Sequence, residues 1–318
     1  MKKVSIIFSF RNEEKNIPEL VKKINQVFDS LSNWKYESIF VNDDSTDSSE
    51  KILLELQKKY PIKIINMSRK FGPGPCVLAG FDNCSGDCAI YMDSDLQDPP
   101  EIIPELIKKY EEGYDVVHTK RTKRVGESKL KLFITRLAYK IINRLSDISL
   151  PTDMGDFKLL SKRVLDQIKK QKEFNPYIRG MSVWVGFNQT FVKYVRKERA
   201  YGETKQHLFS SESLHYGPIS QFIRGVTSYS LAPLYSGIIL GALAFIFSIV
   251  LIIYSLYAKF NGLAVAGSTS VIITVSFFSG IILVTMGIIG IYLARIYEQT
   301  RGRDKYIIKE IKNYKNTN

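Results

Sequence analysis

Two carboxylates and one amide follow a short apolar run in the first third of the chain. Asp93, Asp95 and Gln97 come directly after residues 89–92, whose composition predicts a buried strand. In an extended chain alternate side chains point to the same side, so these three groups converge at the strand's end. Their hard oxygen atoms suit Mg²⁺ or Mn²⁺ and leave coordination positions for substrate phosphates. Such a pair of aspartates is common in turns, and its position after the strand is what favours a metal and phosphate site.

A second polar cluster, residues 42–47, also follows a strand-like run. Ser45, Thr46 and Asp47 are residue types that cap a helix by accepting hydrogen bonds from its first N–H groups. Asp43 stands at the strand end and can reach a nucleoside, so capping and ligand binding are both expected here. Residues 72–75 are rich in glycine and proline but do not complete a GxGxxG motif, and proline lacks the N–H that a phosphate needs. This excludes a dinucleotide-dependent dehydrogenase.

The elements that must position these groups alternate between strand and helix up to about residue 120. The strand candidates are residues 4–9, 38–42, 62–66, 89–92 and 116–119, and the helix candidates are residues 12–31 and 48–60. This alternation predicts right-handed βαβ units and an α/β fold whose mostly parallel, Rossmann-like sheet is flanked by helices. Ligands bind beyond the carboxyl ends of such strands, where Asp43 and Asp93 lie.

The last third of the chain contains two long uncharged segments. The 318 residues include 45 Lys and Arg against 32 Asp and Glu, yet none of these charges lies between Arg224 and Lys259 or between Lys259 and Arg295. We predict membrane helices at about 232–257 and 271–294, because about 20 apolar residues cross the hydrocarbon core. A wholly soluble protein is excluded. Basic residues follow the second span, whereas the connecting loop offers only Lys259, so both chain ends are expected in the cytoplasm.

Cysteine and histidine usage predicts no site of its own. The three cysteines lack paired CxxC spacing, which argues against a disulfide framework or a structural zinc site. The three histidines lack ligand spacing and are expected in structural or surface positions. The N-terminus shows no signal peptide, so the first two hundred or so residues are expected in the cytoplasm.

Several motifs, taken in order, resemble GT-A family 2 glycosyltransferases, and more narrowly the polyisoprenyl-phosphate glycosyltransferases related to dolichyl-phosphate mannose synthase. They are FRNEE at 10–14, FVNDDSTD at 40–47, AGF at 79–81 with SGD at 85–87, MDSDLQDP at 92–99 and GDFKL at 155–159. The ending, GIYLARIYE at 290–298 with RGR at 301–303, resembles the bacterial branch with two C-terminal membrane helices. The resemblance implies a GT-A fold followed by a transmembrane helical hairpin.

The resemblance also implies roles for individual residues. It places Glu13, Asp43 and Asp93 at the nucleotide sugar, and Asp93, Asp95 and Gln97 at the metal. It gives Asp95 and Asp156 a role in catalysis. It places Arg121, Lys131 and Thr135 at the lipid phosphate, and Lys205 in a loop that closes over the site. Departures bear on the sugar and nucleotide preference and on the phosphate contacts. Lys131 stands where the family usually has Arg, Thr135 where it has Ser, Lys70 where it has Asn and Asp44 where it has Gly.

The implied activity is metal-dependent, inverting transfer of a hexose from a nucleotide diphosphate sugar to polyprenyl phosphate, such as undecaprenyl phosphate. UDP-glucose is the first expectation for the donor, and Mg²⁺ or Mn²⁺ for the cofactor. The expected partners are the membrane, the donor and the lipid; no nucleic acid is expected, and a homo-oligomer is left open. The implied domains are a catalytic domain (1–205), an interfacial amphipathic connector (206–231), the two spans with their loop (232–294) and a cytoplasmic basic tail (295–318).

Two alternatives stay open. A processive polysaccharide synthase of the same superfamily would normally carry a Gln-x-x-Arg-Trp segment and more membrane helices. A catalytically inactive scaffold that binds nucleotide sugars would not need the carboxylates of Asp93, Asp95 and Asp156, all of which are present. The protein is therefore predicted to be an active enzyme of a bacterial inner membrane.

Overall fold

The computed structural model divides the chain into two compact units. The first comprises Met1–Arg144, Ile148–Ser228 and Asp304–Asn318, and the second comprises Leu145–Asp147 and Tyr229–Arg303. The structure describes residues 1–124, 143–144, 151, 154–171, 173, 177–196, 218–262 and 267–314.

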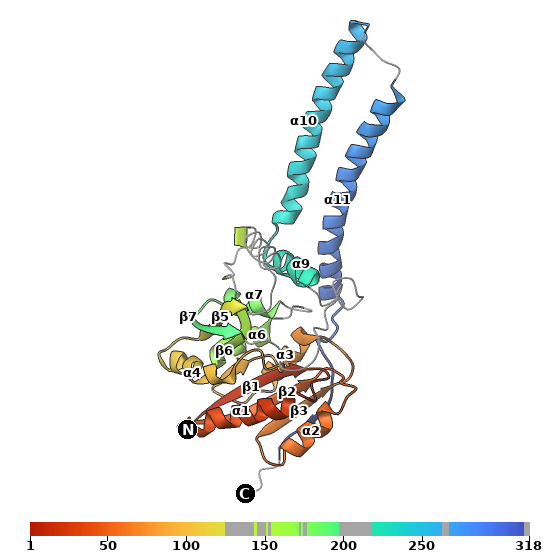
Figure 1. The fold of residues 1–318 in the computed structure, drawn as a ribbon. Coiled ribbons are helices and arrows are strands. Elements are labelled where there is room, and N and C mark those ends of the chain that lie inside the picture. The colour runs from red at the N-terminus through yellow and green to blue at the C-terminus, as the bar shows by residue number, and fades with distance from the viewer. Residues whose placement is uncertain are drawn as a thin grey trace. The chain divides into compact units, whose positions relative to one another are not determined.

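The first unit contains an eight-stranded mixed sheet with the strand order β7-β5-β6-β4-β1-β2-β3-β8 (Figure 1). The strands are β1 (Lys2–Phe10), β2 (Trp34–Asn42), β3 (Ile62–Met67), β4 (Cys88–Tyr91), β5 (Val116–Arg124), β6 (Met154–Ser161), β7 (Gln189–Arg196) and β8 (Ile308–Lys312). Strands β1 to β4 are mutually parallel, whereas β6 and β8 run antiparallel to their neighbours. The predicted mostly parallel sheet is confirmed.

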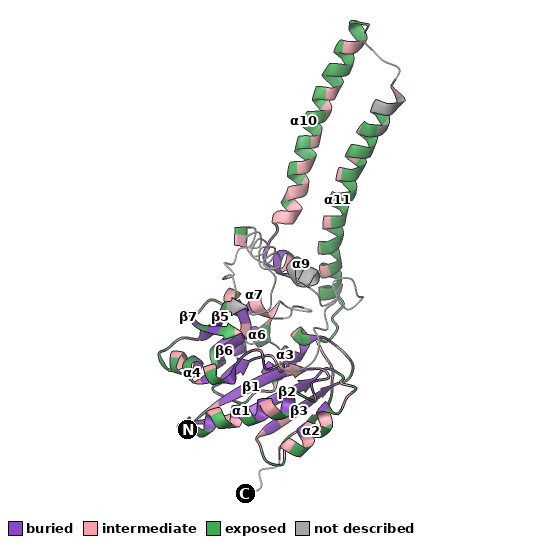
Figure 2. Cartoon of the chain, viewed as in Figure 1, coloured by how far each residue is buried: buried purple, intermediate pink, exposed green. Residues whose placement is uncertain are grey.

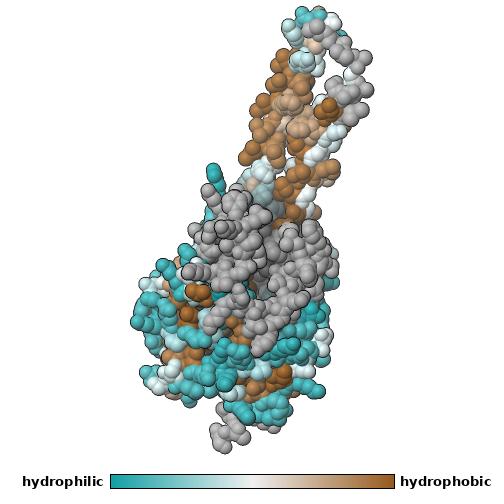
Figure 3. Space-filling view, in the orientation of Figure 1, coloured by the Kyte–Doolittle hydropathy of each residue, from teal (hydrophilic) through white to brown (hydrophobic). Residues whose placement is uncertain are grey.

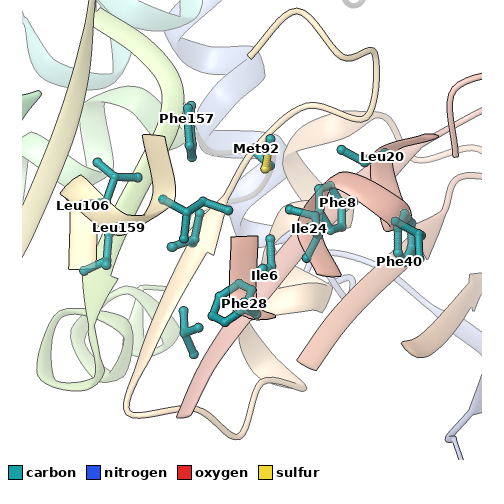
Figure 4. Close-up of a cluster of buried hydrophobic side chains, with 14 of the residues drawn as sticks. Ile6, Phe8, Leu20, Ile24, Phe28, Phe40, Met92, Leu106, Phe157 and Leu159 are labelled. Carbon is teal, nitrogen blue, oxygen red and sulfur yellow. The ribbon is translucent and has the colours of Figure 1, made fainter. Parts of the chain in front are cut away.

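Helices cover both faces of this sheet. One face packs against α1 (Ile17–Asp29), α2 (Ser49–Leu56) and α4 (Ile103–Glu111), and the other against α3 (Pro73–Asp82), α6 (Lys162–Lys170) and α7 (Ile178–Trp184). Successive residues of β1 alternate between the two cores, with Ile6 and Phe8 on the α1 face and Ile7 on the α3 face. Figure 4 shows Ile24 of α1 beside Phe8. Strands β1 to β4 are therefore buried from both sides, as their purple ribbons in Figure 2 show.

Helix α3 begins inside the glycine- and proline-rich segment 72–75. Its first residue is Pro73. Proline is tolerated in the first turn of a helix because the N–H groups there have no partner within the helix. Gly72 precedes it with a φ of 91°, a left-handed conformation that glycine adopts without strain.

The chain returns to the sheet after its long C-terminal helices. Residues 295–318, predicted as a basic tail, include β8, which pairs antiparallel with β3 at the edge of the sheet. Lys312 Nζ lies 2.9 Å from Glu50 Oε1, and the Tyr306 hydroxyl donates to Asp82 Oδ2 at 2.5 Å. The chain thus leaves the first unit after Ser228 and re-enters it at Asp304.

The second unit is built on two long helices, α10 (Ala232–Phe260) and α11 (Ser268–Thr300). By length and composition both can cross a membrane, over Ala232–Phe260 and Ile273–Thr300, and their most apolar stretches are not buried. Their apolar surfaces appear brown in Figure 3. The helices contact each other near Gly237, where an added Cβ would lie 2.8 Å from Thr285 Cγ2, and near Phe247, whose ring centroid lies 5.7 Å from that of Phe277.

The connector predicted at 206–231 falls partly outside the described residues. Its described part contains α9 (Pro218–Tyr229).

Candidate active site

The side chains of the loop after β4 alternate between half-buried and buried positions. Asp93, Asp95 and Gln97 are half-buried, whereas Ser94, Leu96 and Asp98 are buried, which is the alternation predicted from the sequence. Leu96 has a φ of 61°, uncommon for a residue with a side chain, and such conformations cluster at functional sites. The Tyr91 hydroxyl donates to Asp93 Oδ1 at 3.2 Å.

Negative charge is concentrated around Asp93. Burial, followed by the carboxylates of Asp95, Asp98 and Asp156, raises the pKa of Asp93 to about 7, although Arg196 opposes the shift. A carboxyl group surrounded in this way is stabilised as an anion when a cation joins it. The chemistry of this cluster therefore fits a bound divalent cation.

Among the described residues, no three His, Cys, Asp or Glu side chains are arranged to hold a metal ion. The predicted ligands are two carboxylates, Asp93 and Asp95, and the amide of Gln97. Mg²⁺ is commonly held by one or two carboxylates, with the other positions taken by water and substrate phosphates. A set of this size is consistent with a metal bound together with a diphosphate, and the metal site stays a prediction.

Asp156, on β6, forms a two-point ion pair with Arg179, on α7. Arg179 Nε lies 2.9 Å from Asp156 Oδ1, and Nη2 contacts Oδ2. Burial alone would raise the pKa of Asp156, but the charges and hydrogen bonds of Arg179, with Lys158 and Arg121, lower it well below its usual range. Asp156 is therefore held as a carboxylate and is a weak base.

Lys158 lies two residues after Asp156 on the same strand and is fully buried. Its Nζ donates to the Ser182 hydroxyl at 3.0 Å. Burial and the nearby Arg179 lower the pKa of Lys158 to about 8, against the opposing effect of Asp156. Lys158 is thus a second positive group, after Arg179, that acts on the Asp156 carboxylate.

Arg121, on β5, lies in a second network with Tyr194 and Asp98. Its Nε donates to the Tyr194 hydroxyl at 3.1 Å, and that hydroxyl donates to Asp98 Oδ1. Asp98 is fully buried. It does not cap the helices that follow, because neither the 3₁₀ turn Pro100–Ile102 nor α4 receives a side-chain cap. Arg196 Nε lies 3.8 Å from Asp98 Oδ1, and its Nη2 lies 3.9 Å from Asp93 Oδ2. The predicted lipid-phosphate arginine is therefore linked to the loop that carries Asp93.

Asp43, at the end of β2, contacts the start of α3. Its carboxylate accepts hydrogen bonds from the backbone N–H of Phe71 at 2.6 Å and of Gly72 at 3.0 Å. Asp44 has a φ of 58°, which fits the resemblance, since glycine is usual at this position and aspartate tolerates the conformation better than most residues. The nucleotide role of Asp43 stays a prediction.

Glu13 is also buried, and its carboxylate accepts from the Asn16 amide at 2.6 Å. Its backbone N–H donates to the Ser49 hydroxyl at 2.9 Å, which joins the loop after β1 to the first residue of α2. Its predicted contact with the nucleotide sugar remains a prediction.

Three predicted residues, Lys131, Thr135 and Lys205, lie outside the described residues. Sequence reasoning missed four charged or polar residues that the structure places around the site: Lys158, Arg179, Tyr194 and Arg196. Lys158 could have been found, because alternate residues of a strand share a face with Asp156. Arg179, Tyr194 and Arg196 have no comparable local signal, since each reaches its partner from a distant element.

The fold and the site define the class of protein. A mostly parallel sheet flanked by helices, with an Asp-x-Asp loop directly after a central strand, is the architecture of a GT-A glycosyltransferase domain. The chain belongs to glycosyl transferase family 2, since the model of that family, described as "Glycosyl transferase family 2", matches residues 5–169.

Relatives match nearly the whole chain. The uncharacterized glycosyltransferase YkcC of Bacillus subtilis is 40% identical, over 96% of this chain and 93% of its own length. The prophage bactoprenol glucosyl transferase homolog of Escherichia coli is 35% identical, over 98% of this chain and 99% of its own. Among solved structures, glucosyl-3-phosphoglycerate synthase from Mycobacterium tuberculosis, in complex with Mn²⁺, UDP and glucosyl-3-phosphoglycerate, is 18% identical with a TM-score of 0.46, covering 63% of this chain and 73% of that one.

Proposed function

We propose that this family 2 glycosyltransferase transfers a hexose from a nucleotide diphosphate sugar to the phosphate of a polyprenol such as undecaprenol. UDP-glucose is the donor of first choice. The product is a polyprenyl-phosphate sugar, which serves as a donor for glycosylation at the cell surface. Full-length relatives that are named bactoprenol glucosyl transferases, about a third identical to this chain, support this acceptor and this sugar.

One structural observation carries the proposal. The guanidinium of Arg121 is held near the carboxylates of Asp98 and Asp156, and within the described residues neither carboxylate forms a hydrogen bond with it. Within the part of the chain that the structure describes, its hydrogen bond is made through Nε to Tyr194, while Asp98 and Asp156 act on it by charge. An arginine held by Nε can still offer its two terminal nitrogens as a fork, which matches the geometry of a phosphate. A sugar hydroxyl acceptor would not require such a group.

The chemistry of the acceptor agrees with the state of Asp156. A phosphate monoester has a second pKa of about 6, so near neutral pH it is mostly a dianion and needs little help from a base. Asp156 is held ionised by Arg179 and would orient the acceptor. An acceptor phosphate oxygen forms a bond to the anomeric carbon, the bond from that carbon to the diphosphate breaks, and the configuration inverts.

Asp93, Asp95 and Gln97 would hold Mg²⁺ or Mn²⁺, and the bound ion would supply positive charge to the diphosphate. The half-buried position of all three side chains leaves them accessible to a substrate. Arg121 would bind the acceptor phosphate and keep it in line with the anomeric carbon.

We further propose that α10 and α11 cross a bacterial inner membrane with both chain ends in the cytoplasm. The chain leaves the sheet-containing unit before α10 and rejoins the same sheet through β8 after α11. A hairpin of two crossings therefore begins and ends on the side of the catalytic domain. Arg301, Arg303 and Lys305, which follow α11, fit the cytoplasmic side.

Replacing Arg121 with Ala tests the acceptor. The apparent KM for undecaprenyl phosphate should rise, or kcat fall, by a cost of about 1.5–3 kcal/mol for a lost charged hydrogen bond, while the KM for UDP-glucose changes little. Arg163→Ala is the matched control, since this guanidinium binds Asp115 at the start of β5, away from Asp93. A change confined to the donor KM would place the lipid phosphate elsewhere.

A further inference from the structure

The hydroxyl of Tyr194 joins Arg121 to Asp98. We propose that Tyr194 is a positioning residue: it orients the guanidinium of Arg121 toward the acceptor phosphate and links Arg121 to the loop after β4, which would bind the donor. The proposal rests on the proposed function, because it assumes that Arg121 binds a phosphate. Tyr194 comes from β7, Arg121 from β5 and Asp98 from the loop after β4, so one hydroxyl joins three separate segments.

The position of the hydroxyl is fixed by packing. Tyr194 is 3% exposed, and its ring packs edge-on against Phe157, with centroids 6.2 Å apart. Gly155 approaches the hydroxyl from β6, and a Cβ added there would lie 3.2 Å from the Tyr194 oxygen and 2.7 Å from Thr119 Oγ1. The ring has little space to turn, so the oxygen is a fixed point for both of its partners.

The two hydrogen bonds of this oxygen have different consequences. The bond from Arg121 Nε sets the plane of the guanidinium and therefore the direction of its terminal nitrogens. The bond to Asp98 Oδ1 anchors the oxygen to a residue directly after Gln97. Asp98 Oδ2 is buried and has no hydrogen-bond partner among the described residues, and Arg196 Nε lies 3.8 Å from Oδ1, so the Tyr194 hydroxyl supplies the hydrogen bond that this carboxylate accepts there. A shift of the donor loop would therefore reach the Nε of Arg121 through the Tyr194 oxygen.

A double-mutant cycle separates positioning from a general structural role. Tyr194→Phe removes one oxygen atom and should raise the apparent KM for undecaprenyl phosphate about tenfold, as expected for the loss of a hydrogen bond to a charged group. The KM for UDP-glucose should stay within about twofold. In an Arg121→Ala background, Tyr194→Phe should have almost no further effect, because it acts through Arg121. Tyr36→Phe, which removes a hydroxyl bound to Asn25 far along the sheet, should match the wild type.

Additive effects of Tyr194→Phe and Arg121→Ala, or a change in the donor KM alone, would overturn the inference. If Tyr194→Phe does not fold, Asp98→Asn serves in its place, because the amide oxygen still accepts from Tyr194. Its effect on the acceptor KM should then be smaller than that of Arg121→Ala, and a larger effect contradicts the proposal. Failure of the wild type to glycosylate undecaprenyl phosphate would instead remove the proposed function itself.

Discussion

Arg179 binds both carboxylate oxygens of Asp156 from a helix that begins 22 positions later in the chain, with Nε lying 2.9 Å from Oδ1. This pairing lowers the pKa of Asp156 well below its usual range, so the carboxylate is a weaker proton acceptor than an ordinary aspartate. It fits an acceptor that is already charged, and it would be poorly suited to deprotonating a sugar hydroxyl.

Removing Arg179 should change the pH dependence of the reaction. Burial raises the pKa of Asp156 and Arg179 is the largest effect that opposes it, so Arg179→Ala should raise this pKa and steepen the acidic limb of kcat/KM. Arg179→Lys, which keeps the charge but loses the fork, should give a smaller shift. The measurement is kcat/KM from pH 4.5 to 8 in membranes. A uniformly lower rate with an unchanged profile would show that Arg179 only supports the fold.

Asp95 should be essential if a metal joins the donor diphosphate. Asp95→Asn is expected to lower turnover at least about a hundredfold, which is the scale of losing one charge-stabilising group. EDTA should abolish the activity of the wild type. Asp87→Asn is a suitable control, because Asp87 accepts a bond from the Lys3 N–H at the opposite end of the sheet. Full activity of Asp95→Asn, or in EDTA, would remove the metal from the account.

His118 should make the fold sensitive to acid. It is fully buried, stacks on Phe191 with a centroid distance of 5.3 Å and lies 2.9 Å from Gln189 Oε1. Burial, together with Lys158, lowers the pKa of His118 to about 3. Below about pH 6.5 the His118 side chain binds a proton in the unfolded chain but not in the folded chain. The free energy of unfolding therefore falls as pH drops from about 6.5 toward 3.

The slope of this loss is about 1.4 kcal/mol per pH unit for one group. His118→Gln cannot be protonated and should flatten the decline by that amount in denaturation of the detergent-solubilised protein. Equal acid sensitivity in the two proteins would mean that other groups set the slope.

The return of β8 to the sheet predicts the membrane topology. In a background without the three native cysteines, a cysteine at Gly267, between α10 and α11, should react with a membrane-impermeant thiol reagent in intact cells. One at Asn313, just after β8, should react only after the cells are opened. The reverse labelling would contradict the orientation.

Much of the fold could be predicted because its signals are local. Apolar runs and helical spacing located β1 to β4 and α1, and the strand ends then placed Asp43 and Asp93 at the carboxyl edge. Strand β8 could not be predicted in this way, because it depends on a partner more than two hundred residues away that lies before both long helices. By themselves the charged residues of this segment predict a solvated tail, and the pairing with β3 shows that it is a strand.

The site follows the same division. The alternation of Asp93, Asp95 and Gln97 is a property of one short segment and was visible in the sequence. The bond from Tyr194 to Asp98 spans 96 positions and depends on how β7 pairs with β5. Such contacts arise from tertiary structure, which periodicity within a segment does not report.

The acceptor requirement tests the central claim most directly. Membranes containing the protein are incubated with radiolabelled UDP-glucose and either undecaprenyl phosphate or undecaprenol, then extracted into organic solvent and treated with mild acid. We expect organic-soluble label only with the phosphate-bearing lipid, released by the acid as free sugar. Label on undecaprenol alone, or in a water-soluble polymer, would contradict transfer to a lipid phosphate.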